Sequence, residues 1–445
     1  ALVRYQRSLE NDAEFTAQAN WHSVEHEMGF FTDEKTGKMP METKGKDYSY
    51  QLHWQLPISS DSTLLIGQEY YVYQLDDTWP AIEGSSMMGP NDYVNINDGK
   101  RQRAALYGEW QHTLNSRWWL SAGVRYEYVS TNAAEVQPYN TMAMMGMTNV
   151  NAIAADEFNS LYRKRNDNII DATLLARYQL SDTEIIEVGL ARKSRAPNLY
   201  ERYSWGQSTM ATTMIGWFGD GNGYIGNPNL NAETAHTLST AYKLVQDDLA
   251  FSATAWYSRI NDYIDADEVG SFNKTPMTNT RRNILQFTNV NATLFGARID
   301  AEYQLAENRS GKWLMVANAT ATHGERDNGD EPLYQIKPLQ TELALHQELD
   351  DWKNSLSWQW VASKDRVDSQ RLENTTNSYS LLNLSSSIQW QGATMTVAVK
   401  NLLDEYYQLP LGGVSIAQYK TDNSNGFEQI AGAGRSFELN INYAF

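Results

Sequence analysis

Methionine thioethers are the side chains of this sequence whose spacing points most directly to a chemistry. Two short clusters stand out, Met142-Ala-Met-Met-Gly-Met147 and Met210-Ala-Thr-Thr-Met214. A thioether sulfur is a soft ligand that selects Cu(I) over harder cations. The alternative is that these side chains only pack polar loops together. We predict a soft-metal site made from Met142, Met144, Met145, Met147, Met210 and Met214.

The sequence gives no sign of enzymatic chemistry. It lacks the G-x-S-x-G, H-E-x-x-H and P-loop patterns. The seven histidines are scattered, and the absence of cysteine excludes thiolate metal sites. Asp220-Gly-Asn-Gly resembles a calcium loop, but Tyr224 and Asn231 stand where acidic ligands belong, so we interpret it as a glycine-rich turn. We predict no catalytic residue and no cofactor, with a metal ion only as cargo.

Charge and composition exclude some partners and favour a membrane surface. The formal net charge is −18, which argues against nucleic acid, because phosphates need a basic partner. No run of eighteen apolar residues exists, so helical membrane spans are excluded. The chain nevertheless holds 14 Trp, 26 Tyr and 12 Phe, and aromatic side chains of the first two types prefer membrane interfaces.

Period-two alternation indicates strands with one apolar and one polar face. In residues 435–445, Phe437, Leu439, Ile441, Tyr443 and Phe445 alternate with polar or small residues. Residues 118–129, 355–360 and 382–390 alternate in the same way, and their polar faces include Arg, Glu and Gln. A dry interior does not tolerate so many charges, so the polar face must line a wet or plugged lumen. A β-sandwich would invert this pattern.

Tight turns and long polar loops alternate along the chain. Breaks near 116, 181–182, 246–248, 350–351 and 391–392 separate strand-like runs, and long loops lie between these hairpins. Apart from Met28, Met315 and Met395, every methionine falls in a long loop. Short turns on one side and long loops on the other are typical of an outer-membrane barrel. We predict an all-β, transmembrane antiparallel β-barrel with about 17 strands, 283–306 being a single long one. Because such barrels have an even strand number, we expect the N-terminal part to be truncated.

Three motifs carry a family resemblance that spans the whole chain. They are Ser194-Arg-Ala-Pro-Asn-Leu-Tyr200, Asn227-Pro-Asn-Leu-Asn-Ala-Glu233 and Lys400-Asn-Leu-Leu-Asp-Glu-Tyr-Tyr407. In order and spacing they resemble the barrel signatures of TonB-dependent outer-membrane receptors. Physically these motifs end strands. Proline has no backbone N–H to donate to a neighbouring strand, and Asn or Asp side chains can bond nearby backbone groups and so favour a turn. We interpret these residues as serving barrel assembly.

The resemblance implies a 22-stranded barrel, an N-terminal plug and a segment that engages the TonB protein. Neither plug nor TonB segment is recognisable, so we expect residues 1–445 to be a barrel domain with the plug domain absent. The stretch 195–226 also resembles the copper-receptor branch, in which a barrel-side His-x-Met helps to hold copper. Here the matching tripeptide is Ser208-Thr-Met210, so the histidine is missing and that site is in doubt.

The resulting expectation is active import of copper or a copper chelate across the outer membrane of a Gram-negative bacterium. The implied partners are TonB, outer-membrane lipid and lipopolysaccharide, and copper. One alternative is a siderophore or iron-chelate receptor, whose ligand would be cradled by Trp205, Trp217, Phe218 and Tyr224. Another is a passive, porin-like barrel.

Overall fold

The computed structural model describes residues 1–29, 40–142, 149–216, 218–273, 281–329, 331–415, 418 and 427–443. Nearly all of its regular structure is β-strand. The strands are β1 Leu2–Ser8, β2 Glu14–Met28, β3 Met41–Ser59, β4 Ser62–Trp79, β5 Tyr93–Thr113, β6 Trp118–Asn132, β7 Arg165–Ser181, β8 Glu184–Arg195, β9 Gly223–Ile225, β10 Glu233–Val245, β11 Leu249–Asn273, β12 Arg281–Asn308, β13 Gly311–Arg326, β14 Gln340–Leu349, β15 Trp352–Val361, β16 Tyr379–Trp390, β17 Ala393–Lys400 and β18 Ser436–Tyr443. The helices are η1 Glu10–Asp12, α1 Val150–Ser160, α2 Leu199–Tyr203 and α3 Thr209–Met214.

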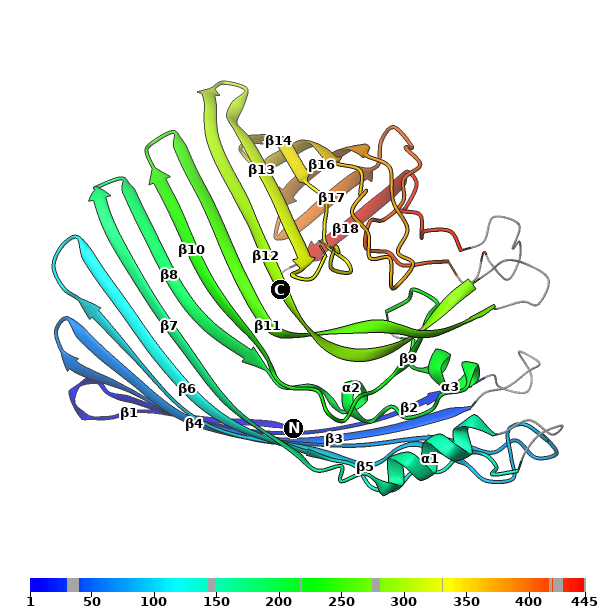
Figure 1. The fold of residues 1–445 in the computed structure, drawn as a ribbon. Coiled ribbons are helices and arrows are strands. Elements are labelled where there is room, and N and C mark those ends of the chain that lie inside the picture. Colours follow the sequence, from blue (N-terminus) through cyan, green and yellow to red (C-terminus); the bar gives the residue numbers. More distant parts are fainter. Residues whose placement is uncertain are drawn as a thin grey trace.

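These strands form one strongly curved, 18-stranded sheet (Figure 1). Each strand pairs antiparallel with the next along the chain, except that β8 pairs with β10 and the short β9 lies parallel to β12. Without β9 the meander has the predicted 17 strands, and β12 is the single long strand expected at 283–306. The prediction of a transmembrane antiparallel barrel is confirmed.

Short hairpins gather at one end of the sheet and long connections at the other (Figure 1). The predicted breaks at 181–182, 246–248, 350–351 and 391–392 all separate paired strands. In the last of these, Gln391 and Gly392 have φ of 46° and 82°, which lets two residues reverse the chain. α1, α2 and α3 all lie in the long connections.

The two faces of the sheet differ as the alternation predicts. On one face Val124, Leu190 and Leu238 are 58%, 52% and 51% exposed, as side chains that face lipid should be. On the opposite face Arg125 Nη2 lies 2.6 Å from Glu69 Oε2 and 2.8 Å from Glu127 Oε2. We call the first face the outer face and the second the inner face.

A compact hydrophobic cluster lies at the loop end. Tyr93 is fully buried, with its ring stacked between Trp79 at 4.3 Å and Trp205 at 4.8 Å. Here the structure corrects two predicted loops, residues 75–100 and 266–280, because β4 extends to Trp79, β5 starts at Tyr93 and β11 continues to Asn273. Met41, expected in a loop, begins β3 and is buried in this cluster. Because these strands continue toward the loop end, their residues join the hydrophobic cluster on which the loops pack.

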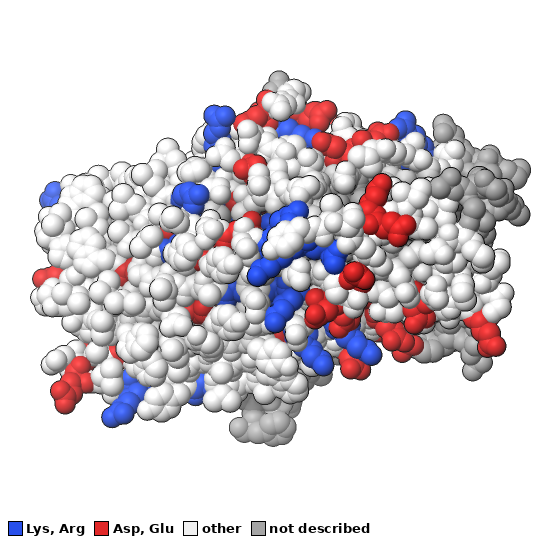
Figure 2. Space-filling view, turned by 60° about the horizontal axis from the view of Figure 1, so that its bottom comes forward, with Lys and Arg blue, Asp and Glu red and all other residues white. Residues whose placement is uncertain are grey.

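Charge is unevenly spread over the surface. From the side shown in Figure 2, Lys and Arg side chains gather near the middle of the face, and Asp and Glu side chains gather nearer the loop end. The hairpin end carries few charges on this face. Within the described ranges, no helix is long and apolar enough to cross a membrane.

Candidate functional site

A cavity of about 380 Å³ lies among the long loops and brings together residues from three separate segments. Its lining residues are Met87, Pro138, Tyr139, Asn140, Asn149, Val150, Asn151, Ser208, Thr209 and Met210. None of these residues carries a carboxylate, an imidazole or a permanent positive charge. The cavity therefore offers thioethers and neutral oxygen groups, but no hard anionic ligand.

Three asparagines hold the cavity wall in place. Asn149 caps α1 by accepting from the backbone N–H groups of Asn151 and Ala152, both at 3.2 Å. Its own amide donates to the Asn140 carbonyl at 2.9 Å and to the Met142 carbonyl at 3.3 Å. Asn140 in turn donates to the carbonyl of Gly89 at 3.3 Å. The segments around 87–90 and 140–142 are thereby fixed to the start of α1.

The third asparagine joins α1 to α3. Asn151 donates to Ser208 Oγ at 2.9 Å, and its Oδ1 accepts from the backbone N–H of Ser208 at 3.0 Å. Ser208 also caps α3 by accepting from the Ala211 N–H at 3.2 Å. Met210 follows two residues after this cap, so the cap fixes where its thioether enters the cavity wall.

The predicted methionines occupy different positions. Met210 borders the cavity and also packs on the hydrophobic cluster, whereas Met214 packs on the cluster without lining the cavity. Met142 is 70% exposed. Met144, Met145 and Met147 lie outside the described residues. A residue outside the predicted set, Met87, also lines the cavity and is 65% exposed. The sequence offers little indication of a role for Met87, because this residue lies far from both methionine clusters.

Tyr139 contributes a neutral phenol to the cavity wall. Burial, with a smaller effect of the Asp92 charge, raises the pKa of Tyr139 to about 12. Its hydroxyl is therefore neutral at physiological pH. The chemistry of the wall remains that of thioether, amide and hydroxyl groups.

The aromatic residues named for an iron-chelate ligand are mostly inside the protein. Trp205 is 4% exposed and Tyr224 is fully buried, both within the hydrophobic cluster. Phe218 is half-buried, with its ring 4.8 Å from that of Tyr224. Trp217 lies outside the described residues. Trp205 and Tyr224 therefore stabilise the loop base and present no open ring face to a ligand.

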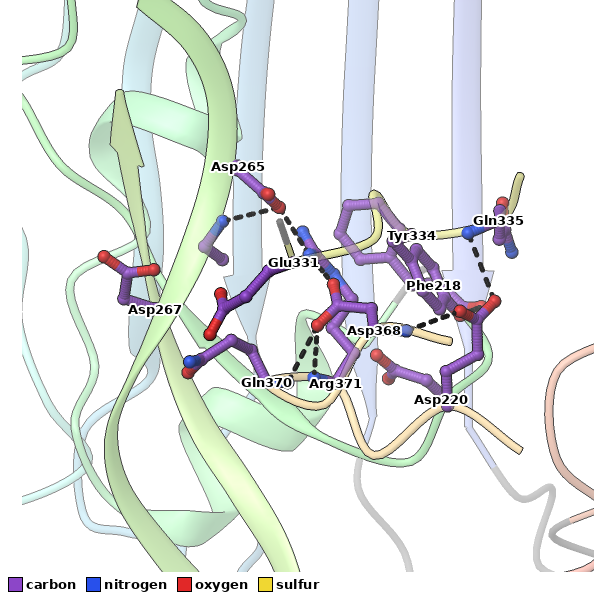
Figure 3. A network of polar contacts seen from close by, with 12 residues as sticks. Phe218, Asp220, Asp265, Asp267, Glu331, Tyr334, Gln335, Asp368, Gln370 and Arg371 are labelled. Atoms are coloured by element: carbon purple, nitrogen blue, oxygen red, sulfur yellow. Dashed lines mark hydrogen bonds and ion pairs between the residues drawn. The ribbon is translucent and has the colours of Figure 1, made fainter. Parts of the chain in front are cut away.

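A buried ionic network ties further loops together (Figure 3). Arg371 is ion-paired with Asp265 and, at 2.8 Å, with Asp368, and its guanidinium lies 4.9 Å from the centre of the Tyr334 ring. Arg326 Nε donates to the other oxygen of Asp265 at 2.8 Å. Burial would lower the pKa of Arg371, but Asp265 and its other anionic neighbours raise it well above its ordinary value. The network fixes the connections after β13 and β15 to β11.

Asp220 belongs to the turn predicted from its glycines. Gly219 and Gly221 have φ of 67° and 77°, and the Asp220 carboxylate accepts from the Asn222 N–H at 3.0 Å and from the Tyr224 hydroxyl. The Asp220 carboxylate thus serves as a hydrogen-bond acceptor within the turn. Across the ranges that the structure describes, no three His, Asp or Glu side chains are grouped so as to hold a metal ion.

The motif residues act as the terminators that the sequence predicts. Asn401 has φ of 50°, accepts from the Glu405 N–H at 2.9 Å and donates to the Ala433 carbonyl at 3.2 Å. At the end of β8, Arg195 is held by Glu201 at 2.9 Å and by Glu233 at 2.8 Å. These pairs join the first two motifs and fix α2 to the ends of β8 and β10.

Comparisons with known proteins place this architecture. Residues 1–402 match the family described as TonB dependent receptor-like, beta-barrel. Among solved structures, the copper transporter OprC shares 18% identity at a TM-score of 0.78, covering 100% of this chain and 64% of that one. The ferric yersiniabactin uptake receptor FyuA from Yersinia pestis shares 14% identity at 0.65, with 97% and 59% covered.

The ferric citrate transporter FecA shares 12% identity at a TM-score of 0.65, covering 98% of this chain and 60% of that one. The chain thus spans less than two thirds of the length of these structures. No curated protein sequence matches it. At these identities the solved structures show the fold alone, and the family match covers nine tenths of the sequence. The chain belongs to the TonB-dependent receptor family.

Proposed function

We propose that this chain is the barrel of an outer-membrane transporter that captures copper, as Cu(I) or in a chelate, with its extracellular loops. The observation that carries the proposal is the loop cavity, which Met87 and Met210 both line although they come from segments far apart in the sequence. Thioethers select Cu(I), and the lining includes no carboxylate or imidazole that would favour Zn(II) or Fe(III). The family consists of receptors and transporters of the Gram-negative outer membrane, and the chemistry required here is binding, without bond making.

Capture and passage have separate structural bases. The cavity lies at the loop end, whereas the inner face beneath it carries paired Arg and Glu side chains that stabilise a polar lumen. Release into the lumen would follow movement of a plug coupled to TonB, as the family implies. The similarity in fold to the copper transporter OprC supports the same cargo. The burial of Trp205 and Tyr224 weighs against an aromatic cradle for an iron chelate.

Replacing the six predicted methionines together with leucine tests the site. We expect the affinity for Ag(I), a redox-inert substitute for Cu(I), to fall at least tenfold, because leucine keeps the volume but removes the sulfur ligand. A tenfold loss corresponds to about 1.4 kcal/mol. Isothermal titration of the purified protein in detergent provides the measurement, and Zn(II) provides the comparison metal.

The matched control replaces Met315 and Met395, which lie on the lipid-facing strands β13 and β17, with leucine. This variant should bind Ag(I) as the original protein does. A separate Met87→Leu/Met210→Leu variant, which removes both thioethers of the cavity lining, should also lower the Ag(I) affinity, and Met214→Leu alone should change it little. An unchanged Ag(I) affinity in the six-residue variant removes the proposal of capture by these loops. Solute conduction by the purified protein without TonB would instead support the porin-like alternative.

A further inference from the structure

Tyr139 places a buried hydroxyl on the wall of the loop cavity. The side chain is 3% exposed, and its ring packs against that of Tyr93, with 5.5 Å between the ring centres. The backbone holds it in place, because the Tyr139 carbonyl accepts from the Asn91 N–H at 3.0 Å. Its hydroxyl forms no hydrogen bond with any residue of the described ranges. Since a buried phenol hydroxyl usually has a partner, this one is a donor that a molecule in the cavity can use.

The other polar side chains of the cavity wall are already engaged or reach water. The three asparagines and Ser208 bond one another and the nearby backbone. Thr209 is exposed, so water can bond to its hydroxyl. Among the wall residues that the structure describes, Tyr139 therefore stands apart, because its hydroxyl is both buried and without a partner in the protein.

The cavity is much larger than a metal ion. Its volume is about 380 Å³, whereas one water molecule takes up about 30 Å³ in the liquid. Pockets that bind small organic molecules measure about 300–1,000 Å³. Met87 and Met210 line the cavity, and none of the described lining residues is charged. The space therefore suits a metal ion that arrives with an organic ligand, and an uncharged complex avoids burying a charge without a partner.

We propose that this cavity binds copper as a small, uncharged complex with an organic ligand, and that Tyr139 donates a hydrogen bond to an acceptor atom of that ligand. The thioethers of Met87 and Met210 add to the copper ion as further ligands, which are weak and axial where the metal is Cu(II). Tyr139 and the uncharged wall select the organic ligand, and the thioethers select the metal. This inference rests on the proposed function and narrows its cargo to one class of copper complex.

The test uses copper(II) bis(glycinate), an uncharged complex whose carboxylate oxygens can accept the hydrogen bond. Purified protein in detergent is dialysed to equilibrium against the complex made with radiolabelled glycine, so that bound copper and bound glycine are counted separately. We expect the protein to retain both together. Tyr139→Phe, which removes only the hydroxyl, should bind the complex about five- to tenfold more weakly. The same variant should keep its affinity for Ag(I), because a phenol hydroxyl is not a ligand for a soft ion.

The matched control is Tyr93→Phe. The Tyr93 hydroxyl is also buried and has no hydrogen-bond partner among the described residues, but Tyr93 does not line the cavity. This variant should bind the complex as the original protein does. Copper(II) bis(aspartate), which adds two carboxylates to the same kind of complex, should bind to the original protein at least tenfold more weakly than the glycine complex.

Three results would overturn the inference. They are copper retained without glycine, a Tyr139→Phe variant that binds the complex as tightly as the original protein, and equal binding of the glycine and aspartate complexes. Each of them leaves the proposed function standing if the six methionine substitutions still lower the Ag(I) affinity. Failure of the proposed function has a different signature, which is an Ag(I) affinity that those six substitutions leave unchanged.

Discussion

Asp265→Leu is expected to lower the free energy of unfolding by about 3–5 kcal/mol, because it leaves two buried guanidiniums without their shared carboxylate. Asp265 is 2% exposed and bridges Arg326 and Arg371, which are 7% and 3% exposed. Arg371 would keep only Asp368 as an anionic partner, and the connections after β13 and β15 would lose their tie to β11. Denaturant titration of the protein in lipid, followed by tryptophan fluorescence, measures the change.

The control for this prediction is an ion pair of similar geometry that is open to water. Arg298 Nε lies 2.7 Å from Asp300 Oδ2, with both side chains largely exposed, so Asp300→Leu should change the free energy by no more than about 1 kcal/mol. Asp265→Asn keeps the hydrogen-bonding shape without the charge and should fall between the two. If Asp265→Leu proves as mild as the control, the network does not hold the loops.

Most of the barrel could be predicted because its physics is local. Lipid on one side and a polar lumen on the other impose an alternation that can be seen in runs such as 118–129 and 382–390. Turn residues mark the hairpins, where Gln391-Gly392 adopts the left-handed backbone that a short reversal requires. Neither signal depends on residues far away in the sequence.

The structure of the loop end was harder to predict, because contacts between residues far apart in the sequence determine it. α1 begins where Asn149 caps it, but that helix is held by Asn140 of the same connection and by Ser208 of another, and these contacts leave no periodic pattern. The strand ends at Trp79 and Tyr93 extend into predicted loops because their rings stack on each other, and the Tyr93 ring also stacks with Trp205, more than a hundred residues later. Met87 likewise lines the cavity together with residues far away in the sequence, and no local pattern indicates this. Sequence clustering predicts thioether ligands but does not indicate which methionines line the same cavity.

Ile299→Arg is expected to cost about 2–4 kcal/mol of unfolding free energy in a bilayer, since it would place a charge near the middle of the lipid-facing belt. Phe295 and Tyr303 lie four residues to either side on the same face of β12, and Ile299 itself is 46% exposed.

Asn318→Arg provides the opposing case, because Asn318 faces the lumen directly opposite Asp300 and its new charge would gain a partner. We expect that variant to remain within about 0.5 kcal/mol of the original protein. Denaturant titrations of both variants in phospholipid vesicles give the comparison. Arg298, the residue before Ile299, is a native example of a cation on the inner face. Equal losses for the two substitutions would mean that both faces meet the same environment, which no membrane barrel allows. The assignment of one face to lipid and the other to a polar lumen would then lose its basis.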